Sequence, residues 1–229
     1  MSEIVLIHGA YQGSWIWKPM AARLRAMGHD VYTPTLDGCA ERAQQLRAGI
    51  TNETHAHEIA ELLRCEDLND AILVGTSTGG MVLCRAAEQA RARVARVVFA
   101  DALALFDGER VADMVSRRNP VTTDFGTGPT HEDARDRLFA ELQADTRDWA
   151  LERYTLHPRA VMEAPITLKS FWMHKWDARV IWCSGSANPP RAHQQRAAAR
   201  LGTPLLTLDT GHYPMLQAPH ELADLIVGN

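Results

Sequence analysis

The feature that most constrains this chain is a serine framed by glycines, Gly75-Thr76-Ser77-Thr78-Gly79. An apolar run of strand length, residues 71–74, precedes it, and a segment of helical periodicity follows it up to about residue 89. A sharp turn from strand to helix needs backbone room on both sides, which glycine provides because it has no Cβ. The pattern therefore predicts that Ser77 is presented at the carboxyl edge of a parallel sheet, where such folds bind ligands.

Strand-length apolar runs alternate with segments of helical periodicity along most of the chain, which is typical of a parallel sheet covered by helices on both faces. The predicted strands are residues 4–7, 31–33, 71–74, 94–100, 180–183 and 205–208. The other predicted helices are residues 15–27, 55–65, 191–201 and 221–227, with Ser14 as N-cap of the first and Gly28 as its stop. We therefore predict an α/β fold with a doubly wound, mostly parallel sheet of about six strands.

A long segment after residue 103 interrupts this alternation. Loop-like stretches at residues 119–129 and 157–165 surround helical sequence at 132–154. We predict a mainly helical cap at residues 104–175, inserted into a core made of residues 1–103 and 176–229. Some cap aromatic residues are expected to line an apolar pocket over Ser77, with Tyr11 and Gln12 at its mouth. The candidates are Phe125, Trp149, Tyr154, Phe171, Trp172 and Trp176.

A serine hydroxyl becomes a good nucleophile only when a base takes its proton. Among the ten histidines, His212 is the best candidate, because it follows the last predicted strand and this architecture places the histidine after the serine. Backbone N–H groups must also stabilise the oxyanion. We expect the N–H groups of Ala10 and Thr78 to do so, with His8 holding the loop that contains Ala10.

Composition limits the partners that this chain can be expected to have. The formal net charge of −4 gives no long-range attraction to nucleic acid. No apolar run approaches the ~20 residues of a membrane-spanning helix, and the N-terminal run is too short for a signal peptide. The four cysteines are scattered without a CxxC motif, which favours a reducing compartment. We expect a cytoplasmic enzyme with a small-molecule substrate and no nucleic-acid or membrane partner, while its oligomeric state, homodimer included, stays open.

His55 and His57 form an HxH pattern that invites comparison with metal sites. The chain has no HExxH motif and no cysteine or carboxylate cluster with suitable spacing. We therefore interpret both as surface or loop histidines and expect neither a metal nor a cofactor.

Three stretches of the chain match motifs of a known superfamily. They are Val5-Leu6-Ile7-His8-Gly9-Ala10 with Trp15 and Trp17, Leu73-Val74-Gly75-Thr76-Ser77-Thr78-Gly79-Gly80-Met81, and Gly211-His212-Tyr213-Pro214-Met215-Leu216. With these motifs the chain resembles the α/β-hydrolase superfamily, in particular bacterial carboxylesterases related to plant methylesterases and hydroxynitrile lyases. The likeness covers essentially the whole chain outside the cap, and it implies Ser77 as nucleophile and His212 as base.

The family's catalytic acid is missing from its usual place. After the strand predicted at residues 180–183, the position of the acid holds Ser186. Without an acid, the histidine loses control of its tautomer and stabilisation of its charge. Asp101, at the end of the preceding strand, could supply the carboxylate, a relocation known in the superfamily. Ser186 or Asn188 could instead orient His212 as a neutral acceptor, or Asp101 could simply cap backbone groups.

The sequence therefore leaves three hypotheses. The leading one is an esterase-like serine hydrolase that acts on a medium-sized, partly apolar ester or lactone. The second is a non-hydrolytic enzyme of the same fold, a lyase or cyclase, and the third is a ligand-binding protein that has lost catalysis. Cyanohydrin cleavage is disfavoured, because Gly9 and Tyr213 stand where the lyases have threonine and lysine. Thr76, where histidine is commoner in the family, changes only the pocket floor.

Overall fold

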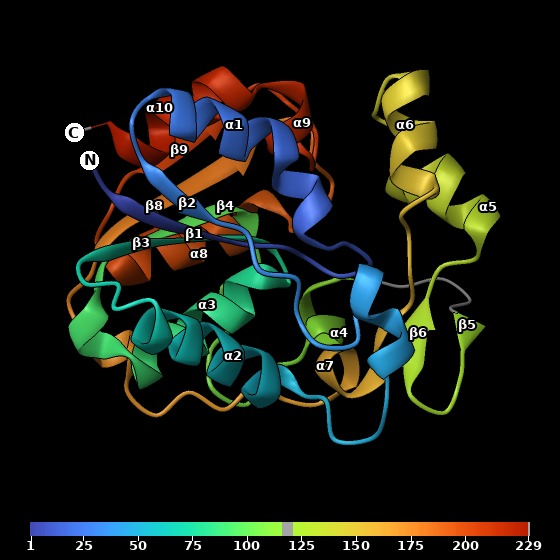
Figure 1. Ribbon diagram of the computed structural model, residues 1–229, viewed down its shortest axis with the longest axis horizontal. Coiled ribbons are helices and arrows are strands. Elements are labelled where there is room, and N and C mark those ends of the chain that lie inside the picture. Colours follow the sequence, from blue (N-terminus) through green and yellow to red (C-terminus); the bar gives the residue numbers. More distant parts are fainter. Residues whose placement is uncertain (116–120, 229) are drawn as a thin grey trace.

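The computed structural model describes residues 1–115 and 121–228, which form a large sheet, a small sheet and the helices around them (Figure 1). The large sheet has six parallel strands in the order β2-β1-β3-β4-β8-β9. These are β1 (Glu3–Ile7), β2 (Asp30–Tyr32), β3 (Ala71–Ser77), β4 (Val94–Ala102), β8 (Asp177–Cys183) and β9 (Leu205–Leu208). The prediction of an α/β fold with about six parallel strands is therefore confirmed.

Helices cover both faces of this sheet, and each face has its own cluster of buried apolar side chains. One face carries α1 (Lys18–Ala26) and α10 (Pro219–Val227), and the other carries α2 (Asn52–Cys65), α3 (Gly79–Gln89) and α8 (Arg191–Leu201). β3 and β4 are almost wholly buried, because they are central strands packed on both sides. Short helical turns complete the core: η1 (Ser14–Trp17), η2 (Ala40–Gln45), η3 (Arg91–Arg93) and α9 (Pro214–Gln217).

The described residues from 103 to 163 lie over the carboxyl edge of the large sheet (Figure 1), whereas residues 170–173 pack on the C-terminal part of α3, where Glu88 accepts the Phe171 N–H. The helical elements between β4 and β8 are α4 (Val111–Met114), α5 (His131–Asp133), the π-helical turn η4 (Ala134–Leu138), α6 (Ala144–Leu151), α7 (Arg159–Glu163) and η5 (Phe171–Met173). A three-stranded antiparallel sheet joins them: β5 (Val121–Thr122), β6 (Gly126–Gly128) and β7 (His157–Pro158). This small sheet was not predicted, since strands of two or three residues are too short to show a period.

Several predicted elements differ from the structure. Ser14 is not an N-cap: it lies inside η1, and α1 begins at Lys18 without a side-chain cap. Helical sequence at 132–154 is broken near Leu142, because the chain turns there to bury Phe139 and Leu142. The stretches predicted as loops contain β5, β6, β7 and α7, although residues 119 and 120 lie outside the described residues.

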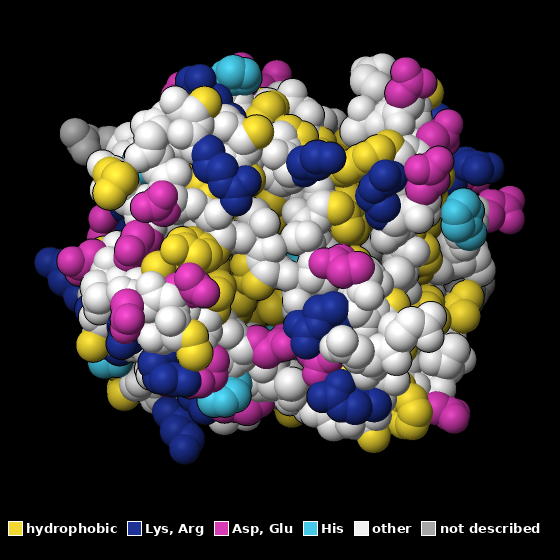
Figure 2. Space-filling view, in the orientation of Figure 1, with side chains coloured by type: hydrophobic (Ala, Val, Ile, Leu, Met, Phe, Trp, Pro, Cys, Tyr) yellow, Lys and Arg dark blue, Asp and Glu magenta, His cyan; other side chains and the backbone are white. Residues whose placement is uncertain are grey.

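Figure 2 shows basic and acidic side chains interspersed over one face of the molecule, which gives that face no strong field of one sign. Among the described residues, none of the helices is both long and apolar enough to cross a membrane.

Candidate active site

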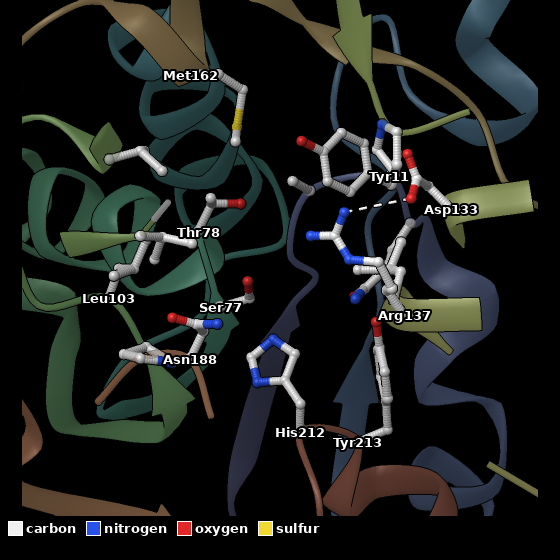
Figure 3. Close-up of a pocket in the computed structure, with 17 residues that line it drawn as sticks. Tyr11, Ser77, Thr78, Leu103, Asp133, Arg137, Met162, Asn188, His212 and Tyr213 are labelled. Carbon is white, nitrogen blue, oxygen red and sulfur yellow. Dashed lines mark hydrogen bonds and ion pairs between the residues drawn. The ribbon is translucent and has the colours of Figure 1, made fainter. Parts of the chain in front are cut away.

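Ser77 occupies the last position of β3, and only Thr78 separates it from α3. Its φ of 49° lies in the left-handed region, which residues other than glycine rarely adopt. The glycines around it are required by close packing: a Cβ on Gly75 would lie 2.7 Å from the Gly79 carbonyl oxygen, and one on Gly79 would lie 2.5 Å from that of Ile7. This strained turn presents the Ser77 side chain to a pocket rather than to the core (Figure 3).

The loop after β1 passes against the serine. A Cβ on Gly9 would come within 2.6 Å of the Ser77 Cβ, so only glycine fits there. Gln12 Oε1 accepts the Gly9 N–H at 3.1 Å and thereby shapes the loop. The backbone N–H groups of Ala10 and Thr78 have no hydrogen-bond acceptor within the described part of the chain, and both residues line the pocket.

His8 holds this loop in place through hydrogen bonds of its ring. Its Nδ1 donates to the Gly9 carbonyl oxygen at 2.8 Å, and its Nε2 accepts the Leu36 N–H at 3.0 Å. The side chain is fully buried, and burial lowers the pKa of His8 to about 4. A neutral His8 therefore connects the loop after β1 to the segment after β2.

His212 follows β9, and its ring faces Ser77 across the pocket (Figure 3). Its Nδ1 lies 2.6 Å from Asp101 Oδ2. Burial would lower the pKa of His212, but the hydrogen bond and the charge of Asp101, with a contribution from Glu141, raise it above its usual value. With Nδ1 donating to Asp101, Nε2 is left as the acceptor that faces the serine.

Asp101 comes from the carboxyl end of β4, the strand between β3 and β8. Its side chain is fully buried, and its second oxygen, Oδ1, accepts the Cys183 N–H at 3.2 Å. Its φ of 48° turns the chain out of regular strand geometry at this point. Both oxygens of Asp101 are thus occupied, one by the backbone of β8 and one by His212.

The other two candidates for orienting His212 do not reach it. Ser186 is partly exposed, and its Oγ donates to the Asn188 carbonyl oxygen at 3.1 Å. Asn188 lines the pocket, but among the described residues His212 hydrogen-bonds neither of the two. The structure therefore brings Ser77, His212 and Asp101 together and places Ser186 to one side.

The pocket over Ser77 has an apolar wall and a polar wall (Figure 3). Apolar side chains come from Leu103, Val111, Val115, Leu138 and Met162. On the polar side, Arg137 and Asp133 form an ion pair of 3.2 Å beside Tyr11 and Gln12.

The prediction that cap aromatic residues line the pocket was wrong, since none of the six is among its described lining residues. Phe171, Trp172 and Trp176 pack on one another, because bulky rings lose most contact with water inside such a cluster. Trp149 packs edge-on against Trp15, with 5.3 Å between ring centroids. The apolar wall is built instead from aliphatic side chains, whose spacing in the sequence shows no motif.

Glu141 is a residue that sequence reasoning missed. Its carboxylate lies against the loop that carries His212, where Oε1 accepts the Tyr213 N–H at 3.1 Å. An isolated glutamate in a cap segment matches no motif, so nothing in the sequence singles it out.

The interpretation of the HxH pattern was half wrong. His57 is exposed as predicted, whereas His55 is fully buried on α2 and its Nε2 donates to the Asp37 carbonyl oxygen at 2.9 Å. Within the described ranges, no group of three or more histidine, cysteine, aspartate or glutamate side chains could hold a metal ion.

Comparison with known proteins shows which family the chain belongs to. The model of the "Alpha/beta hydrolase family" matches residues 4–225. The chain belongs to this family. Among curated α/β hydrolases, a carbendazim hydrolyzing esterase of Nocardioides sp. (strain SG-4G) is 30% identical over 237 residues, which cover 98% of each protein. A putative chloroplastic methylesterase of Arabidopsis thaliana is 31% identical over 51% of this chain and 34% of its own length.

Solved α/β hydrolases share the fold at lower identity. An extracellular α/β-hydrolase from a Paenibacillus species superimposes with a TM-score of 0.84 at 23% identity, covering 99% of this chain and 98% of its own. A methylesterase from Arabidopsis gives a TM-score of 0.80 at 18% identity, covering 97% and 96%. The structural matches support the fold, while the family model and the full-length esterase relative make the chain an esterase-like α/β hydrolase, as the motifs predicted.

Proposed function

We propose that this protein is a serine hydrolase of carboxylic esters in which Ser77, His212 and Asp101 form the catalytic triad. The observation that carries the proposal is the 2.6 Å contact between His212 Nδ1 and Asp101 Oδ2, at a histidine whose ring faces Ser77. The contact supplies, from β4, the carboxylate that position 186 lacks. The lyase, cyclase and binding-protein alternatives were motivated by that missing acid, and no other observation favours them.

The proposed reaction begins when His212 Nε2 takes the proton of Ser77 as its Oγ attacks the ester carbonyl carbon. The N–H groups of Ala10 and Thr78 then donate to the oxyanion of the tetrahedral intermediate. Its collapse breaks the ester bond, and the protonated His212 gives its proton to the leaving alcohol. Water, deprotonated by His212, attacks the acyl-enzyme and releases the acid and free Ser77. Throughout these steps Asp101 keeps Nδ1 protonated and stabilises the imidazolium.

The substrate we propose is a medium-sized, partly apolar ester or lactone. The aliphatic wall favours an apolar group on one side of the ester bond, because burying such a group releases water from both surfaces. The names of the relatives, a carbendazim hydrolyzing esterase and methylesterases, are compatible with this class. We also propose that residues 104–175 act as a cap that sets specificity, since the ion pair and much of the aliphatic wall come from them.

A fluorophosphonate probe tests the nucleophile directly, because it phosphonylates only an activated serine. We expect covalent labelling at Ser77, located by peptide mass spectrometry, together with turnover of p-nitrophenyl esters. Ser77→Ala should abolish both, while Ser184→Ala, a matched change at an exposed serine bonded to Asp209, should abolish neither. Failure of the folded wild-type protein to react with the probe or turn over any ester in the series would refute the proposal.

A further inference from the structure

The loop that carries His212 is tied to the cap through Glu141. In addition to the Tyr213 N–H bonded to its carboxylate, the Glu141 carbonyl oxygen accepts from Gln217 Nε2 at 3.2 Å. Gln217 Oε1 in turn accepts the Gly211 N–H at 3.0 Å. The residues on both sides of His212 are therefore bonded, directly or through Gln217, to one cap residue.

Buried packing fixes the position of this cap segment. Phe139 is fully buried and its ring lies against Tyr213, with 5.3 Å between ring centroids. Leu142, on the other side of Glu141, is only 5% exposed. Because both flanking side chains are anchored, the backbone of Glu141 is fixed beside the loop, and its exposed side chain bonds the loop from there.

Because Gly211 has no side chain, it leaves room for the Glu141 carboxylate. The three atoms nearest to a Cβ built on Gly211 all belong to that carboxyl group, at 2.2 to 2.4 Å. Any side chain at position 211 would therefore displace the carboxylate from the Tyr213 N–H. The φ of Gly211 is not in the left-handed region, so contact with Glu141, rather than backbone conformation, is the reason for a glycine here.

Two carboxylates thus flank His212. Asp101 bonds Nδ1 from the core, and Glu141 lies on the cap side of the same loop. The pKa of Glu141 lies above its usual value, because partial burial raises it by more than the charge of His212 and the Tyr213 N–H lower it. Solvent reaches part of Glu141, so its influence on the ring is weaker than that of the buried Asp101.

We propose that Glu141 is a positioning residue: it anchors the His212 loop to the cap and places a second carboxylate beside that loop during the reaction. The catalytic consequence rests on the function proposed above, because it requires His212 to act as base. The anchoring and the effect on the imidazole do not require turnover and can be measured in the resting protein.

The first test is an NMR titration of the His212 ring in wild type, Glu141→Gln and the matched control Glu132→Gln, which removes an exposed charge from the same cap. Glutamine keeps an oxygen to accept the Tyr213 N–H, so the fold is expected to persist. We expect Glu141→Gln to lower the pKa of His212 and Glu132→Gln to leave it unchanged. An identical pKa in Glu141→Gln and wild type would overturn the proposal, even if the protein turned over esters normally.

The second test is a double-mutant cycle between Gly211 and Glu141, read as kcat for a p-nitrophenyl ester. Gly211→Ala and Glu141→Ala should each lower kcat about tenfold, the effect of losing one charge-assisted hydrogen bond. The double variant should lose no more than either single one, because the alanine methyl group then meets no carboxylate. Additive losses would overturn the proposal, whereas a wild-type protein without esterase activity would refute the proposed function and leave the titration to decide on Glu141.

Discussion

Replacing Asp101 by asparagine tests the proposed triad most sharply, because the structure dictates how the amide must sit. The Cys183 N–H donates to Asp101 Oδ1, so an amide oxygen is required at that position. The NH₂ group then occupies the position of Oδ2 and donates to His212 Nδ1. This forces the proton of the neutral ring onto Nε2, which can no longer accept the proton of Ser77.

The expected loss is large. Turning the amide over would restore an acceptor for Nδ1, but it would leave the buried Cys183 N–H unpaired at a cost of about 1–3 kcal/mol. The wrong tautomer therefore predominates, and removal of the buried carboxylate also withdraws its stabilisation of the imidazolium. The same change in a serine protease triad lowers kcat about 10⁴-fold, or about 5 kcal/mol in the barrier, and we expect about 10³- to 10⁴-fold here.

Hydrolysis of p-nitrophenyl butyrate at pH 8 provides the assay, with circular dichroism to verify folding. Ser186→Ala is the matched comparison, since Ser186 Oγ donates to the Asn188 carbonyl oxygen and not to His212. This variant should keep kcat within about threefold of wild type, because Ser186 is not among the described pocket-lining residues and does not bond His212. The reasoning is refuted if folded Asp101→Asn retains more than a tenth of wild-type kcat, or if Ser186→Ala loses as much as Asp101→Asn.

Three further outcomes follow from the structure. Burial lowers the pKa of His8 and of His193 to about 4, so the unfolded chain binds more protons and stability falls as the pH drops from 6.5 towards 4. At pH 5 each histidine should lower the free energy of unfolding by about 2 kcal/mol relative to pH 8. Urea unfolding measures this for wild type and His193→Gln, and the variant should lose less stability between pH 8 and pH 5. The same loss in both proteins would contradict the assignment to His193. Because Asp101 raises the pKa of His212 above 6.5, the acidic limb of the kcat/KM profile should lie above pH 6.5, and a limb below it would argue against this base. Gly9→Ala should lower kcat at least about 10²-fold, because the added methyl group displaces Ser77. Unchanged kinetics would show that the loop after β1 moves and leaves Ser77 in place.

Much of the core could be predicted from the sequence, because its signals are local. Buried central strands are continuous apolar runs, and both residues 71–74 and 94–100 were found within the bounds of β3 and β4. The small sheet of the cap escaped prediction because β5 and β7 contain only two residues each. The aromatic residues of the cap were assigned to the wrong environment, since an aromatic ring fits a core cluster as well as a pocket wall.

For the candidate site, the sequence by itself determined Ser77 and its turn, because the strand, the glycines and the helix that form it are adjacent in the chain. It also placed His212, whose order after the last strand follows from the topology. Which group meets His212 Nδ1 was decided only by the tertiary structure, because Asp101 reaches it from the end of β4 and Ser186 turns away after β8. Glu141 likewise depends on how the cap docks against the loop of His212, 71 positions further along the chain. Contacts between segments so far apart are set by packing, which a local pattern of residues does not encode.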